Sequence, residues 1–228
     1  MLQPLKFGVS AVTADGRDVG SLYRVVVAER VTPERPVYVV TAVTVRRRLL
    51  ESGNLLKPGG WEAPRDLKVP FAQVTGADEG EARLSLTEEE FLALPPYIVG
   101  DVPEPAPGST PPPGFEAEDI AMRAGALLGG GLYDPPHDEQ ENRGANERHV
   151  SAGAPVWRRA PHEHIGDLDH VLMDDVSNVV EGLVVRRGVL FTHDVVVPAR
   201  AIAVLLDDLV QVNLQGDTGA LEDYQAES

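Results

Sequence analysis

The side chains best suited to chemistry are histidines in the second half of the chain. Imidazole nitrogen is a common ligand for divalent metal ions, and carboxylates often complete such sites. If the turn at 162–164 and the turn near Gly188 lie at the same end of a strand meander, three imidazoles approach one another. The candidate ligands are His162, His164 and His193. The alternative is that they are ordinary exposed turn histidines, because His-x-His has no third partner in register, and we expect no metal site.

Three consecutive arginines form the second candidate site. Arg46, Arg47 and Arg48 end a β-branched run, and Arg186-Arg187 ends a similar run later in the chain. They could contact an acidic partner, but long charged side chains at strand ends also discourage edge-to-edge pairing. A glycine- and proline-rich insertion at 49–64 follows and contains Trp61. Loops of this kind often carry specificity, so the three arginines and Trp61 are our partner-binding candidates.

Several kinds of catalytic site are missing from the sequence. The chain has no cysteine, which excludes thiolate catalysis, disulfides and cysteine-ligated metals. It has no glycine-rich phosphate loop and no Gly-x-Ser-x-Gly motif. Glu88, Glu89 and Glu90 follow Thr87 at the spacing of a helix capping box, where acidic residues favourably meet the helix dipole. We therefore predict a protein that is not an enzyme, with no catalytic residue and no cofactor.

Charge is unevenly distributed along the 228 residues, whose net charge is −16. Residues 1–97 contain 12 Lys and Arg against 13 Asp and Glu, residues 98–149 contain 3 against 10, and residues 150–228 contain 5 against 13. Acidic segments do not neutralise phosphates, so nucleic-acid binding is not expected unless the near-neutral first half meets a ribosome. The apolar runs are too short to span a membrane, and a cytoplasmic location is expected.

Many landmarks occur twice in the same order. Val40–Arg47 resembles Val180–Arg187, Val69-Pro70 resembles Val197-Pro198, and Leu94 with Tyr97 resembles Leu221 with Tyr224. Repeated core and turn residues indicate a duplicated small fold. Each copy contains short β-branched runs separated by turn signals, such as Ala14-Asp-Gly16. We predict an all-β protein, with two small barrels in tandem, each of about five to six short antiparallel strands.

The predicted domains are 1–97 and 150–228, joined by a linker at 98–149. The linker is acidic and rich in proline and glycine, a composition typical of flexible chain. Residues 116–128 could form a short helix inside it, because apolar residues there share one helical face. The length of the linker allows the two barrels to pack as a pseudo-dimer or to exchange between two chains in a homodimer.

The motifs in both copies resemble the PRC-barrel superfamily of small β-barrels. In the first copy the similar segments are Ala14–Gly20, Val69-Pro70 with Val74, and Thr87–Tyr97. In the second they are Ile165-Gly166, Gly188–Phe191, Val196–Pro198, and Leu221 with Tyr224, although Tyr224 lacks the preceding Leu-Pro. This resemblance implies an assembly module that docks on other proteins and carries no catalytic residues.

Three functions follow as hypotheses. The first is a protein-binding tandem module that uses the 49–64 insertion or the contact between barrels. The second is an RNA- or ribosome-associated protein, which the resemblance to a ribosome maturation factor and the arginines at 46–48 suggest. The third is a metal-binding protein that uses the turn at His162 and His164.

Overall fold

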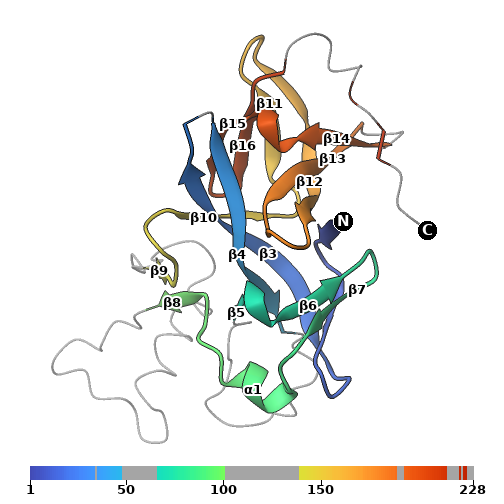
Figure 1. The fold of residues 1–228 in the computed structure, drawn as a ribbon, viewed down its shortest axis with the longest axis vertical. Helices are drawn as coiled ribbons and strands as arrows, with labels where there is room; N and C mark the ends of the chain where they lie inside the picture. Colours follow the sequence, from blue (N-terminus) through green and yellow to red (C-terminus); the bar gives the residue numbers. More distant parts are fainter. Residues whose placement is uncertain are drawn as a thin grey trace, which may run out of the picture.

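The computed structural model describes residues 1–33, 35–47, 66–100, 139–188, 193–214, 221 and 223–224. The protein is mostly β, as predicted, and the strands of the described residues form two seven-stranded sheets and one two-stranded sheet. Figure 1 shows one large sheet below the other, with the long hairpin of the lower sheet rising beside the upper one. Within the described residues, no helix has the length and apolar character needed to cross a bilayer.

The lower sheet is built mainly from the first half of the chain. Its path is β5-β4-β3-β2-β7-β6. The strands are β2 (Ser10–Val12), β3 (Asp18–Val31), β4 (Pro36–Arg46), β5 (Asp66–Pro70), β6 (Val74–Ala77) and β7 (Glu81–Leu84), with a 3-10 turn η1 (Phe71–Gln73) between β5 and β6. Runs of valine favour the strand conformation of β3 and β4, and several consecutive residues in each are buried, so both faces of these strands are covered there.

The upper sheet has the same arrangement. Its path is β14-β13-β12-β11-β16-β15. The strands are β11 (Pro155–Arg158), β12 (Glu163–Asp174), β13 (Val180–Arg187), β14 (His193–Pro198), β15 (Ile202–Leu206) and β16 (Leu209–Val212), with η2 (Ala199–Ala201) after β14. The prediction of antiparallel strands throughout is wrong at one place in each sheet, because β2 pairs with β7, and β11 with β16, in parallel.

The helix α1 (Glu88–Leu92) follows β7. Thr87 accepts a hydrogen bond from the backbone N–H of Glu90, and the Glu90 side chain accepts one from the Thr87 backbone N–H. This confirms the capping box, which satisfies two backbone donors that a helix start leaves free. Phe91 on the buried side of α1 anchors the helix to the core.

One strand of each half pairs with the sheet of the other half. β1 (Leu2–Lys6) lies antiparallel to β12, with Lys6 opposite His170. β10 (Glu147–Ser151) lies antiparallel to β3, with Ser151 opposite Arg24. The predicted boundaries at 97 and 150 therefore do not separate the two sheets, because a strand crosses in each direction.

Backbone hydrogen bonds show which positions of the two sheets correspond. Gly8 N–H donates to the Leu22 carbonyl at 2.7 Å, and Gly153 N–H donates to the Leu168 carbonyl at 2.9 Å. Two residues further along each strand, Arg24 of β3 and His170 of β12 occupy equivalent places. Near the ends of the two halves, Tyr97 N–H bonds to the Asp66 carbonyl and Tyr224 N–H to the Asp194 carbonyl, both at 2.7 Å.

The larger of two apolar clusters in the described residues runs through both sheets. It contains Val25 and Val43 of the lower sheet together with Val171 and Leu183 of the upper sheet, all fully buried. The β3–β4 hairpin reaches the upper half, where Val39 bridges to Val179. Each fully buried valine or leucine contributes about 1.5–3 kcal/mol relative to exposure, so the shared core joins the halves strongly.

The two-stranded sheet is formed by residues from both ends of the predicted linker. β8 (Ile98–Gly100) lies antiparallel to β9 (Glu139–Glu141), with Gly100 opposite Glu139. The expectation of flexible chain throughout 98–149 is therefore wrong for 98–100, 139–141 and 147–149, because these residues form β8, β9 and part of β10. The predicted helix at 116–128 and the 49–64 insertion lie outside the described residues.

Candidate functional site

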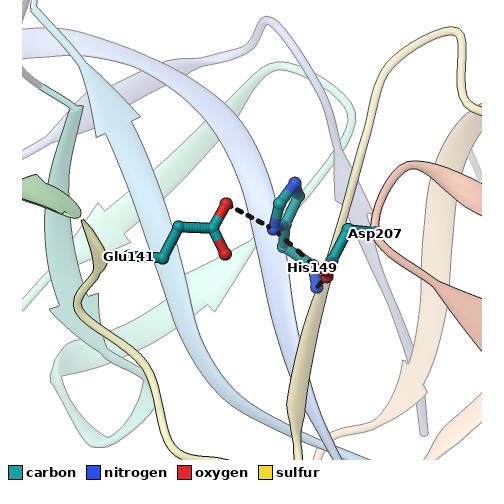
Figure 2. Close-up of side chains that lie close together, drawn as sticks. All are labelled: Glu141, His149 and Asp207. Carbon is teal, nitrogen blue, oxygen red and sulfur yellow. Dashed lines mark hydrogen bonds and ion pairs between the residues drawn. The ribbon is translucent and has the colours of Figure 1, made fainter. Parts of the chain in front are cut away.

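Polar side chains converge where the two large sheets and the small sheet meet. Figure 2 shows Glu141 at the end of β9, His149 in β10 and Asp207 in the turn between β15 and β16, all pointing toward one another. One ligand-capable atom from each lies within 4.8 Å of those of the other two. We call this group, together with Arg143 and Asp208, the seam cluster.

His149 occupies the centre of the seam cluster and is only 4% exposed. Its Nδ1 atom lies 3.0 Å from the hydroxyl oxygen of Tyr97, and the two rings meet edge to face with centroids 5.7 Å apart. Burial raises the pKa of the Tyr97 phenol, so this hydroxyl stays protonated and donates. Tyr97 of the first half therefore bonds to the ring of His149, which lies on β10, the strand that crosses from the second half.

Asp208 holds the other side of the imidazole. Its Oδ2 atom lies 3.2 Å from His149 Nε2, and its Oδ1 accepts a hydrogen bond from the Ser151 hydroxyl at 2.7 Å. Burial alone would raise the pKa of Asp208, but the bonds to His149 and Ser151 outweigh it and the pKa is lowered. Asp208 has a φ of 51°, a left-handed conformation that aspartate tolerates in tight turns.

Arg143 ties the two remaining carboxylates together. Its guanidinium donates to both oxygens of Asp207, at 3.0 and 2.8 Å, and is ion-paired with Glu141. The backbone N–H of His149 also donates to Asp207, at 3.2 Å. The seam cluster therefore connects β9, β10 and the β15–β16 turn through charge-assisted hydrogen bonds, which are stronger than neutral ones.

Serine, histidine and aspartate occur together here, but their order does not suit nucleophilic catalysis. In a catalytic triad the imidazole lies between the hydroxyl and the carboxylate and takes the hydroxyl proton. In the seam cluster the carboxylate of Asp208 lies between Ser151 and His149 and bonds to both. The Ser151 hydroxyl therefore donates its hydrogen bond to Asp208 and not to the imidazole of His149, which would have to remove the proton in a catalytic triad.

A second group of polar residues lies at the equivalent contact on the other side of the molecule. Lys6 of β1 is ion-paired with Glu79 at 3.1 Å, and the Tyr224 hydroxyl donates to the same carboxylate at 3.0 Å. His170 packs edge to face against Tyr224 with centroids 4.7 Å apart, and its Nδ1 lies 2.9 Å from Asp169. His170 is 1% exposed, and its buried Nε2 has no hydrogen-bond partner among the described residues.

The predicted metal ligands do not converge. His162 and His164 both pack against Trp157, with centroid distances of 4.7 and 4.9 Å, and His164 bonds to Asp167 at 3.2 Å. His193 is exposed at the start of β14, two strands from β12. Among the described residues, only the trio of Glu141, His149 and Asp207 meets the geometric requirement for shared metal binding.

The arginine site is partly a structural one. Arg46 donates to Asp66 at 2.9 and 3.2 Å and lies over the ring of Tyr23, 3.2 Å from its centroid. Arg24 donates to the same carboxylate at 2.6 Å. These contacts hold the Arg46 guanidinium against the sheet, whereas Arg47 follows the end of β4. Arg48 and Trp61 lie outside the described residues.

Sequence reasoning missed the seam cluster. Glu141 and Arg143 fall in what reads as acidic linker, and His149 lies at the predicted domain boundary. The turn residues Asp207-Asp208 read as an ordinary exposed hairpin. The residue types gave no signal for the strand that carries His149, because Val150 is the one apolar residue in Glu147–Ser151.

No family model matches this chain, and no curated protein shows significant sequence similarity to it.

Proposed function

We propose that this protein is a non-enzymatic assembly module of the PRC-barrel type, in which two small barrel-like halves form one body that binds another protein. The support comes from how the polar residues are used. In the described part of the chain, the two buried histidines, His149 and His170, lie at contacts between the halves, where tyrosine and carboxylate groups bond to them or pack against them. A partner would then bind on the outer surface.

The observation that carries this proposal is an exposed apolar patch at one end of the β1–β12 pair. Leu2 is 54% exposed and Val176, in the turn after β12, is 86% exposed. Asp174, opposite Leu2, and its neighbour Asp175 lie at the rim, where both pair with the amino group of Met1. Neighbouring exposed apolar groups with a polar rim are typical of protein interaction sites. We propose a protein partner whose contact surface is apolar at its centre and polar around it.

Comparative affinity capture tests this proposal. Tagged wild-type protein is compared with a Leu2→Ser/Val176→Ser double variant, and with Val31→Ser as the matched control, because Val31 at the other hairpin tip is also 86% exposed. We expect a protein that wild type and Val31→Ser retain and the double variant loses. Capture of no protein, or equal capture by the double variant, would contradict the proposal. A cytoplasmic location remains a prediction.

A further inference from the structure

We propose that Glu141, His149 and Asp207 form a binding site for one divalent cation of the zinc class, which joins the three sheets. The ligands come from β9, β10 and the β15–β16 turn, which belong to three different sheets. A backbone hydrogen bond from Asp208 N–H to the His149 carbonyl already joins the turn to β10, and a bound ion would tie β9 to both. This function is separate from partner binding at the Leu2–Val176 patch and does not depend on it.

The spacing of the ligand atoms suits tetrahedral coordination. His149 Nδ1 lies 3.5 Å from Glu141 Oε1 and 3.5 Å from Asp207 Oδ1. Ligands held about 2.1 Å from zinc at tetrahedral angles are about 3.4 Å apart. The Glu141 and Asp207 oxygens lie within 4.8 Å of each other, so they would move closer together around an ion, and Asp207 Oδ1 would exchange a hydrogen bond for it. A water molecule can supply the fourth ligand.

The outer partner of His149 leaves the correct nitrogen available. Nε2 lies 3.2 Å from Asp208, and the ionised carboxylate can only accept a hydrogen bond, so the ring N–H is placed on Nε2. Nδ1 then carries a lone pair and faces two carboxylate oxygens at 3.5 Å. Histidines that bind metals commonly donate their other N–H to a carboxylate in this way. An ion would replace the Tyr97 hydroxyl as the partner of Nδ1.

The charge balance of the seam cluster also calls for a cation. It contains the carboxylates of Glu141, Asp207 and Asp208, and the guanidinium of Arg143 is the cation that pairs with them directly. With no charge counted for His149, these three carboxylates and one guanidinium sum to about −2. The carboxylates are 26–42% exposed and Arg24 also acts on Asp208, so their repulsion is partly screened but not cancelled. A divalent ion neutralises this charge.

At the equivalent contact between the halves, formed by Lys6, Glu79 and Tyr224, a lysine side chain provides the positive charge. There the turn carboxylate of Glu79 is paired with the ammonium group of Lys6, on the strand that crosses from the other half. The position equivalent to Lys6 on β10 is Ser151, since Lys6 is opposite His170 and Ser151 is opposite Arg24. The seam cluster therefore has more carboxylates and lacks the lysine.

The test is a titration of the full-length protein with Co²⁺, followed by its visible absorption, and with Zn²⁺, followed by calorimetry. We expect one ion per chain, a tetrahedral Co²⁺ spectrum that Zn²⁺ abolishes, and a rise in melting temperature with Zn²⁺, because a ligand selective for the folded state stabilises it. Glu141→Gln and Asp207→Asn are chosen because both side chains are partly exposed and the variants should fold, which circular dichroism checks.

Each variant should weaken binding by about tenfold or more, whereas the control His162→Ala/His164→Ala should bind like wild type. Two results would overturn the proposal. One is the absence of Zn²⁺ binding by the folded wild-type protein. The other is binding that the control variant loses and Glu141→Gln and Asp207→Asn retain, which would assign the ion to the histidines beside Trp157.

Discussion

Gly20 and Gly166 occupy matching positions in the two sheets, and each lies against the backbone carbonyl of an arginine on the neighbouring strand. A β-carbon at Gly20 would be 2.3 Å from the Arg46 carbonyl oxygen, and one at Gly166 would be 2.3 Å from that of Arg186. Real carbon–oxygen contacts are not this short, so any side chain would force the strands apart.

We therefore expect Gly20→Ala and Gly166→Ala each to lower the free energy of unfolding by about 2–3 kcal/mol, the usual effect of overpacking. Urea denaturation measures this. Gly144→Ala is the matched control, because its β-carbon would meet only side-chain atoms at 3.5 Å or more, and its effect should stay within about 0.5 kcal/mol. Equal effects at Gly144 and Gly20 would contradict the close approach.

Asp66 should be the most sensitive charged residue of the lower sheet. Its carboxylate is buried and accepts hydrogen bonds from Arg24 and Arg46. Asp66→Asn leaves two partly buried guanidinium groups without their counter-ion, and we expect a loss of about 3–5 kcal/mol in the free energy of unfolding. Asp78→Asn, in an exposed pair with Arg83, should cost less than about 1 kcal/mol. Similar losses for both variants would show that burial of Asp66 is unimportant.

Residues 101–138 should be dispensable for folding. Gly100 and Glu139 are paired across β8 and β9, so a two-residue Asn-Gly turn can replace the segment between them. Because each doubling of loop length costs about 0.6 kcal/mol, the shortened protein should gain up to about 2.5 kcal/mol in free energy of unfolding. Urea denaturation of the two proteins measures the difference. A shortened protein that is unfolded, or clearly less stable, would contradict the β8–β9 pairing.

Acid should destabilise the protein through His170. Burial lowers the pKa of His170, and the hydrogen bond and charge of Asp169 only partly oppose this, with Lys6, Glu79 and Tyr224 also facing the ring. The unfolded chain has the ordinary histidine pKa of about 6.5 and binds the proton more readily. The stabilising effect is therefore complete above pH ~6.5 and is lost as the pH falls toward the folded-state pKa, by at most about 1.4 kcal/mol per pH unit.

Melting temperatures recorded between pH 7 and pH 5 check this prediction. His170→Gln should remove most of the slope, whereas His164→Gln, a partly exposed residue, should not change it. The carboxylates of Asp208 and Glu147 also have lowered pKa values, but they lose their stabilising effect only at lower pH, near and below their ordinary values of about 4. An unchanged slope in His170→Gln would contradict the role of the buried imidazole.

The sequence predicted the local features of this fold well. The β-branched runs that contain Val25 and Val43, the Asp15-Gly16 turn and the cap at Thr87 depend on neighbours in sequence, and each forms the expected element. Even the proline that ends β5 is followed by the same 3-10 turn as the proline that ends β14.

The contacts between the halves could not be predicted in the same way. The segment Leu2–Lys6 contains Pro4 and has weak strand character, and it becomes a strand because β12 offers it an antiparallel edge. His149 and Asp207 are far apart in sequence and meet only when β10 crosses to β3. Such pairings depend on the shape of the assembled core, which composition and periodicity do not describe.

Reciprocal pairing of β1 with β12 and of β10 with β3 underlies the proposed single body, and native-state hydrogen exchange tests it most directly. Mass spectrometry at rising urea gives the opening free energy of peptides covering 2–6 and 147–151. We predict that both peptides exchange only through global unfolding, with the same free energy as peptides from β3 and β12. Fast exchange of 2–6 and 147–151 while β3 and β12 stay protected, or two separate unfolding energies for the halves, would contradict the account.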